Sequence, residues 1–271
     1  MKNLVNIIIL LFSVLFLLSC EKVIDVDLKD AESRLVIEGN ITSDVGPYTV
    51  YLSKSGSYFD YSTLERVENG EVIISDENGY SEVLNEVSPG IYQTQNMQGE
   101  ENTNYSIQVV SEGEIYTAEE YLPNKVEIDT MYFEKDEPGS YGNDENTVTY
   151  SIYCVFTDPA ETVDYYRFKI YTNGLLEEAG FGTYLVTDDE LFNGITFPVR
   201  FAGREVVPGD TVKIELQTTG FNTYEYFRTV NDAIGGGGMG STPYNPITNL
   251  DNDALGYFGA YNNSASEVVI Q

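Results

Sequence analysis

The clearest chemical signal in the sequence surrounds Cys20. A short basic start is followed by an apolar run over residues 4–18, which leads into Ser19 and Cys20. A run this short is typical of a cleaved secretory signal rather than a transmembrane helix. The sequence therefore predicts a signal peptide over residues 1–19, removed by a lipoprotein peptidase, and a lipid on Cys20. The alternative is a buried amino-terminal helix in which the cysteine falls by chance.

An acylated Cys20 would hold the mature chain at a membrane surface. Each methylene of an acyl chain such as palmitate contributes roughly 0.8 kcal/mol of attachment, so several chains make a lasting anchor. We expect residues 20–34 to be a lipidated tether between the membrane and the folded part of the chain.

The amino-acid composition excludes most common kinds of catalytic site. The chain has no His, no Trp and two Cys, so Ser-His-Asp triads, Cys-His dyads and His-containing zinc sites are excluded. Cys154 shares one face of an alternating run with Ile152 and Phe156, which predicts core packing rather than a reactive thiol. We expect no catalytic residue, no cofactor and no enzyme activity. Pairs of Asp and Glu leave an acidic-residue hydrolase as the third choice of function.

Two short motifs resemble ligand sites only in part. Residues 235–241 have glycines at P-loop separation, but Ser241 stands where the phosphate-binding Lys is needed. Asp251-Asn252-Asp253 begins like a calcium loop, yet Leu255 replaces an oxygen ligand and Asn262 replaces the bidentate Glu. We predict no metal site, and a weak, irregular calcium site is the alternative.

The charge of the chain restricts its partners. There are 44 Asp and Glu against 14 Lys and Arg, which gives a formal net charge of −30. The negative electrostatic potential of such a chain repels phosphate backbones, so nucleic acid is excluded as a partner. The same potential attracts divalent cations and basic surfaces. An acidic surface that keeps the protein soluble is the favoured explanation.

The elements that must position any site are β-strands. Short β-branched and Tyr-rich runs over residues 35–124 predict a small antiparallel sandwich of immunoglobulin-like or prealbumin-like type. Asn78-Gly79 predicts a type I′ hairpin turn, and Ser88-Pro89-Gly90 predicts a second turn.

A second β-rich part is predicted over residues 125–271. Residues 134–146 are polar and acidic and indicate an exposed hairpin loop. Residues 222–233 have helical spacing of apolar side chains and predict one short amphipathic helix, followed by a Gly-rich loop over residues 235–240. The predicted fold is all-β, with two sandwich-like parts and one helix in the second.

Aromatic side chains are the candidate binding residues. Most of the 22 Tyr and 13 Phe occupy alternate strand positions, where packing is the default. Tyr141, Tyr244, Tyr257 and Tyr261 fall in expected loops or glycine-rich stretches, and exposed rings there could contact a partner or stack on a sugar. For Tyr244 we favour a partner contact, and for Tyr257 and Phe258 packing within the domain.

Several ordered motifs carry a family resemblance. The signal with Cys20 is followed by residues 23–28, 35–42 and 46–50 and by the distal Leu255-Gly256-Tyr257-Phe258-Gly259-Ala260-Tyr261. This order resembles the Bacteroidota lipoproteins grouped as domain of unknown function 4249. The resemblance implies an outer-membrane lipoprotein, often encoded beside a TonB-dependent transporter, and it implies no catalytic residues.

The tract after Cys20 resembles a surface-export signal of the same lipoproteins. Glu21-Lys22 has Asp25 and Asp27 nearby, although the carboxylates are not contiguous. Exposure at the cell surface is expected, and attachment that faces the periplasm stays open.

Two threonines resemble acceptors of the phylum's O-glycosylation. They are Thr130 in Asp129-Thr130-Met131 and Thr211 in Asp210-Thr211-Val212. Ordinary strand threonines are the alternative.

Together these features favour a lipid-anchored accessory subunit of an outer-membrane TonB-dependent transporter that captures a nutrient ligand. A tethered domain raises the local concentration of a ligand without chemistry of its own. A structural or assembly subunit that binds only protein is the alternative.

Overall fold

Alternating apolar and polar residues build three sheets in the computed structural model, which describes residues 33–56, 65–142, 146–177, 185–235 and 244–271. A nine-stranded sheet has the spatial order β12 (Leu175–Leu176), β11 (Tyr165–Thr172), β15 (Thr211–Thr219), β16 (Leu255–Val269), β1 (Leu35–Thr42), β2 (Thr49–Lys54), β6 (Ile91–Gln93) and β5 (Asn85–Ser88), and β13 (Leu185–Asp188) pairs with β11. The four-stranded sheet is β4 (Ser81–Val83), β3 (Glu71–Asp76), β7 (Thr103–Ser111) and β8 (Glu114–Leu122). The three-stranded sheet is β14 (Thr196–Arg204), β10 (Tyr150–Thr157) and β9 (Ile128–Lys135).

Two hydrophobic cores lie on the same face of the nine-stranded sheet. The first core joins β1, β2 and the start of β16 to the four-stranded sheet and includes Ile37 and Ile107. The second core joins β11, β15 and the end of β16 to the three-stranded sheet and includes Ile214 and Ile152. The all-β fold with two sandwich-like parts is therefore confirmed.

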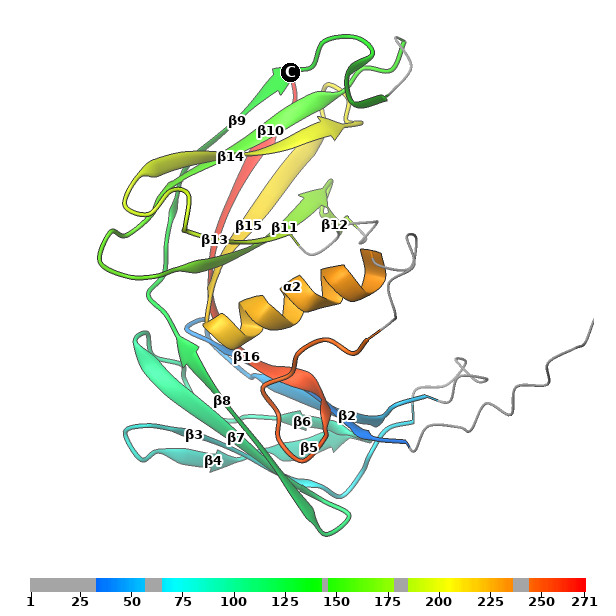
Figure 1. The fold of residues 1–271 in the computed structure, drawn as a ribbon, viewed down its shortest axis with the longest axis vertical. Helices are drawn as coiled ribbons and strands as arrows, with labels where there is room; N and C mark the ends of the chain where they lie inside the picture. The colour runs from blue at the N-terminus through cyan, green and yellow to red at the C-terminus, as the bar shows by residue number, and fades with distance from the viewer. Residues whose placement is uncertain (1–32, 57–64, 143–145, 178–184, 236–243) are drawn as a thin grey trace, which may run out of the picture. The chain divides into compact units, whose positions relative to one another are not determined.

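Strand β16 belongs to both sandwiches. Its first half runs parallel to β1, from Leu255 opposite Val36 to Tyr261 opposite Thr42. From Tyr261 onward it runs antiparallel to β15. Figure 1 shows this long strand passing from the β1 and β2 region to the region of β9 and β10. The first half of β16 completes the first core, although β16 lies far beyond residue 125 in the sequence. A domain boundary at residue 125 would therefore assign β16 to the second part alone.

The expectation that Tyr257 and Tyr261 lie in a loop is wrong, because both belong to β16. The glycines allow close approach of neighbouring chains rather than a loop. A Cβ on Gly256, whose φ is +90°, would lie 2.1 Å from the Ile37 carbonyl oxygen, and one on Gly259 would lie 2.6 Å from Asn40 Oδ1. Glycine inside a strand pattern thus marks tight packing here.

The predicted helix is confirmed as α2 (Phe221–Gly235). The Ser88-Pro89-Gly90 turn joins β5 to β6 as expected, with Gly90 at φ +65°. The type I′ prediction at Asn78-Gly79 is wrong, since only Gly79 has positive φ there, and a type I′ turn requires it at both central residues.

Of the exposed loop predicted over residues 134–146, Glu134 and Lys135 belong to β9 instead, and residues 143–145 lie outside the described residues. The described remainder follows β9 and includes a short 3-10 turn, η2 (Ser140–Gly142). Most of the Gly-rich loop at 235–240 lies outside the described residues. In the described part of the chain, no helix is both long enough and apolar enough to cross a membrane.

Candidate functional site

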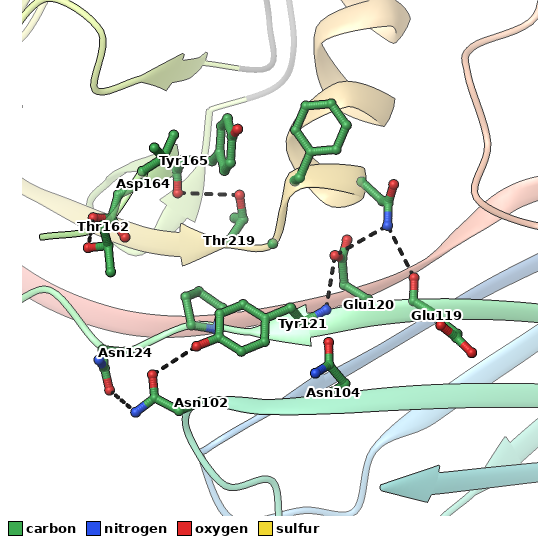
Figure 2. A pocket seen from close by; sticks show the side chains of 15 residues that line it. Asn102, Asn104, Glu119, Glu120, Tyr121, Asn124, Thr162, Asp164, Tyr165 and Thr219 are labelled. Atoms are coloured by element: carbon green, nitrogen blue, oxygen red, sulfur yellow. Dashed lines mark hydrogen bonds between the residues drawn. The ribbon is translucent and has the colours of Figure 1, made fainter. Parts of the chain in front are cut away.

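A pocket of about 380 Å³ lies where β8, the start of β11 and the amino-terminal end of α2 meet. Figure 2 shows the side chains that line it. They come from four segments of the chain: Asn102 and Asn104; Glu119, Glu120, Tyr121, Pro123 and Asn124; Thr162, Val163, Asp164 and Tyr165; and Thr219, Gly220, Phe221 and Asn222. The pocket therefore depends on the joint between the two sandwiches.

Glu120 forms the centre of that joint. Its Oε2 accepts hydrogen bonds from the Thr223 backbone N–H at 2.6 Å and the Thr223 hydroxyl at 2.8 Å. Its Oε1 accepts from Tyr121 N–H at 3.1 Å and Asn222 Nδ2 at 3.5 Å. The first backbone N–H groups of a helix lack partners within the helix, so Glu120 caps α2 from a distant strand.

Burial destabilises the ionised form of the Glu120 carboxyl. Only 3% of the residue is exposed, and burial raises the pKa of its carboxyl from 4.5 to about 7, although the bonds from Thr223, Tyr121 and Asn222 act in the opposite direction. Gly220 permits the contact, because a Cβ there would lie 2.2 Å from Glu120 Oε1.

Amide side chains form another part of the pocket wall. The Tyr121 hydroxyl donates to Asn102 Oδ1 at 2.9 Å, and Asn102 Nδ2 donates to Asn124 Oδ1 at 2.6 Å (Figure 2). Asn104 Nδ2 donates to Glu77 and Asn222 Nδ2 to the Glu119 carbonyl. These bonds leave Asn104 Oδ1, Asn222 Oδ1 and Asn124 Nδ2 without a hydrogen bond to any residue that the structure describes.

The lining contains three carboxyl groups, from Glu119, Glu120 and Asp164, and no Lys or Arg. Anionic ligands therefore meet repulsion without a compensating cation. Free amide acceptors and donors beside aromatic rings suit a ligand with neutral hydroxyl groups.

Asp164 also belongs to a buried cluster with Asp158 and Asp189, whose ligand atoms lie within 4.8 Å of one another. Carboxylate oxygens are the ligands that Ca²⁺ prefers. The three side chains already connect loops, because Asp158 accepts from Tyr166 Oη at 2.5 Å and Gly194 N–H at 2.9 Å, and Asp189 accepts from Asp164 N–H at 2.9 Å. Burial and the neighbouring carboxylates raise the pKa of Asp164. Sequence reasoning missed this cluster, since only the fold brings its members together.

The sequence-predicted aromatic residues lie at separate places. Phe258 is fully buried in the first core, and the Tyr257 ring stacks on Tyr226 with a centroid distance of 4.5 Å, so both pack within the domain as predicted. Tyr261 lies on the same strand face as Tyr257, partly buried rather than in an exposed loop.

Tyr141 and Tyr244 are exposed, at 52% and 47%. Tyr141 adopts φ +58° in η2 and its ring lies beside the Arg200 guanidinium. Contact of either tyrosine with a partner stays a prediction.

The remaining predicted residues have clear positions. Cys154 is fully buried in the second core, and burial raises the pKa of its thiol to about 12, which confirms a packing role. Thr130 is exposed on β9 and Thr211 partly buried on β15; their glycosylation stays a prediction. Asp251 of the partial calcium motif binds the N–H and hydroxyl of Thr117 at 2.6 and 2.7 Å.

The lipid site cannot be placed in this way, because Cys20 and the tract at 21–27 lie outside the described residues.

Comparison with known proteins identifies one family. A family model described as "Domain of unknown function (DUF4249)" matches residues 21–267. Among solved structures, a two-domain fibronectin type-III segment of chicken tenascin is similar at 15% identity over 69% of this chain and 91% of that chain, with a TM-score of 0.22. No curated protein matches the sequence.

Proposed function

The chain belongs to the DUF4249 family, and from this premise we propose that it is a lipid-anchored outer-membrane protein of Bacteroidota that captures a ligand for a TonB-dependent transporter without catalysing a reaction. The signal over residues 1–19 and the acidic tract after Cys20 support attachment at the cell surface. The residues from Ser33 onward form one compact unit that the tether would present beyond the membrane.

The pocket at the joint is the observation that carries the capture role. Its unpaired amide groups can accept from and donate to hydroxyl groups, and Tyr121 and Phe221 offer partly exposed rings. A pocket of about 380 Å³ is in the size range of small-molecule sites. The ligand class that fits is a neutral, hydroxyl-rich molecule such as an oligosaccharide.

A titration of the full-length protein in detergent tests this role. Neutral oligosaccharides should bind, and matched uronic acids should bind more weakly. Asn124→Ala should weaken binding about five-fold, since a hydrogen bond contributes about 1 kcal/mol. Asn85→Ala is the control, because Asn85 is an exposed residue of β5, a strand that contributes no residue to the pocket lining. Equal loss in both variants would contradict the assignment of the site.

A second candidate function, assembly with protein alone, is favoured by apolar side chains in the pocket lining. Val163 is 68% exposed, Phe221 52% and Tyr121 40%. Exposed apolar groups that gather on a surface often mark protein contacts. Isolation from detergent-solubilised outer membrane should recover a stoichiometric transporter. If Phe221→Ser abolishes this recovery and no oligosaccharide binds the wild type, the assembly function replaces capture.

The anchor has its own test. Cys20→Ala should abolish incorporation of labelled palmitate and stop processing by the lipoprotein peptidase. Protease added to intact cells should degrade the wild type, and joint neutralisation of Glu21, Asp25 and Asp27 should protect it. Labelling of Cys20→Ala would defeat the lipid assignment, and resistance of the wild type would place the protein on the periplasmic face.

A further inference from the structure

The three-stranded sheet carries a row of planar side chains on the side opposite the second core. Tyr132 of β9 pairs with Tyr153 of β10, and Tyr153 pairs with Arg200 of β14. The rings of Tyr132 and Tyr153 stack at a centroid distance of 4.5 Å, with 6° between their planes. The Arg200 guanidinium lies 5.9 Å from the centroid of the Tyr153 ring. Each strand of the sheet therefore contributes one planar group to the row.

The β14 end of this row is fixed by hydrogen bonds. Arg200 Nε donates to Ser151 Oγ at 3.0 Å, and Arg200 Nη2 lies 3.4 Å from Asp136 Oδ1. The same guanidinium donates to the Tyr141 hydroxyl. The Ser151 hydroxyl in turn donates to Asp136 at 2.5 Å. The charge of Arg200 is therefore already paired.

The β9 end of the row is open. Tyr132 is 39% exposed, and one face of its ring contacts Tyr153. No other ring and no guanidinium in the described part of the chain lies against Tyr132. Strand β9 is the last strand of its sheet (Figure 1). The opposite edge strand, β14, contains Pro198 and Gly203, whereas β9 contains neither Pro nor Gly and so lacks the residues that interrupt pairing at a sheet edge.

The hydrogen-bond pattern shows which backbone groups of β9 face the open side. The Asp136 N–H donates to the Thr149 carbonyl at 3.0 Å, in register with the pairs between β9 and β10. The direction of the backbone groups alternates along an antiparallel ladder. The backbone groups of Tyr132 therefore face β10. The groups that face away from β10 are those of Met131, Phe133 and Lys135.

The spacing of the two rings matches the spacing of strands. Neighbouring strands lie about 4.7–4.9 Å apart, and the centroids of Tyr132 and Tyr153 are 4.5 Å apart. A strand that paired with β9 would place the residue opposite Tyr132 at a similar distance, with its side chain against the open face of the ring. A planar side chain at that position would extend the row by one member.

The charges around Tyr132 favour a cationic planar group. Residues 127–137 contain five Asp and Glu and one Lys. Glu134 is exposed two residues along β9 from Tyr132; its Oε2 accepts from the Tyr153 hydroxyl at 3.0 Å, and its Oε1 accepts from no residue that the structure describes. A guanidinium can stack on a ring and donate N–H groups in its own plane. Arginine therefore fits opposite Tyr132, whereas a second copy of this chain would bring like charges together.

We propose that β9 is a docking edge for a partner protein, whose extended basic segment pairs antiparallel with β9 and places an arginine on Tyr132 beside Glu134. Both existing pairs in this sheet are antiparallel. Backbone hydrogen bonds to the outward groups of β9 supply affinity, and the arginine supplies specificity. No residue of β9 lines the amide pocket, so this docking edge is independent of oligosaccharide capture.

A fluorescently labelled synthetic peptide of 8 residues, the length of β9, is the probe. Its valines alternate with arginine and threonine, and fluorescence anisotropy with the full-length protein in detergent should show binding. Replacement of arginine by lysine should weaken binding about five-fold, because an ammonium keeps the charge but is not planar. Replacement by glutamate should abolish binding.

N-methylation of the peptide tests the strand pairing. In an antiparallel pair, the residue opposite Tyr132 directs its N–H away from β9, and its neighbours direct theirs toward β9. Methylation of the valine N–H groups should therefore abolish binding, whereas methylation of the arginine and threonine N–H groups should leave it unchanged. Equal binding of both methylated peptides would overturn the docking edge.

Variants of the protein test the same contact from the other side. Tyr132→Leu should weaken binding of the arginine peptide about five-fold. Tyr80→Leu is the control, because Tyr80 is 46% exposed in the turn between β3 and β4 of the other sandwich. Lys135→Pro removes one outward N–H and should weaken binding about five-fold, whereas Lys135→Ala keeps that N–H and should not weaken it.

The peptide series uses the wild type, so it tests the proposal even where a variant fails to fold. Absence of binding of the arginine peptide to the wild type would overturn the docking edge. Equal binding of the arginine and lysine peptides, or of the wild type and Tyr132→Leu, would overturn the contact with Tyr132. Loss of oligosaccharide binding in Tyr132→Leu, with no peptide binding to the wild type, would assign the row to sugar stacking instead of a protein partner.

Discussion

Glu120→Gln should remove a pH dependence of stability that the wild type carries at the joint between β8 and α2. The Glu120 carboxyl has its usual pKa of 4.5 in the unfolded chain and a pKa of about 7 in the folded protein. Below pH 4.5 it is protonated in both states, and its contribution to stability is fully present. As the pH rises through 7, the folded protein must bury a charge that the unfolded chain exposes to water. The contribution is then lost, by roughly 3 kcal/mol, since each pKa unit corresponds to about 1.4 kcal/mol.

Urea unfolding of the wild type and Glu120→Gln, measured by circular dichroism at several pH values between 4.5 and 8.5, checks this expectation. The unfolding free energy of the wild type minus that of the variant should fall by roughly 3 kcal/mol as the pH rises from 4.5 to 8.5. Glu119→Gln is the control, because Glu119 is an exposed neighbour and should keep the wild-type pH profile. Parallel profiles for the wild type and Glu120→Gln would refute the reasoning, since they would show that the hydrogen bonds from Thr223 outweigh burial.

Three further substitutions and one thiol reagent test packing and the partner contact. Gly220→Ala should lower the unfolding free energy by about 2 kcal/mol, because its Cβ would collide with Glu120; an unchanged urea midpoint would contradict this close contact. Cys154 should react with a thiol reagent near pH 8 only after denaturant is added, and rapid labelling of the folded protein would show that its burial is incomplete. Phe258→Ala should lower the unfolding free energy by about 3–5 kcal/mol and lower the melting temperature. Tyr244→Ala should leave the melting temperature unchanged and weaken co-purification with the transporter. The reverse pattern would contradict both assignments.

The sequence predicts strands best where one face is buried. Residues 211–219 and 150–157 alternate in type as a half-buried strand requires, and both segments are strands. The helix is recognisable at 222–233 because its apolar side chains have helical spacing. By contrast, β5 is exposed at all four positions, so no apolar alternation marks it. Strand β16 escapes prediction because Gly256 and Gly259 resemble loop residues until the neighbouring Ile37 and Asn40 are known.

The candidate sites are less accessible to sequence reasoning, because their residues meet only through pairing of distant segments. Glu120 is one of many acidic residues until Gly220 and Thr223 are placed against it. Tyr261, which the sequence selects as a candidate binding residue, is a partly buried residue of β16 rather than a loop residue.

The position of β16 also determines the order in which the protein can fold. Its partner β1 is the first described strand, so the parallel pair joins opposite ends of the folded region. Contacts between residues so far apart in sequence are slow to form. Neither core can be completed until residues 255–269 have paired with β1 and β15, because Phe258 belongs to the first core and Val268 packs against the second. A chain that crosses a membrane beginning with its amino terminus would therefore stay open until transport is nearly complete, and one late strand would then close both sandwiches together.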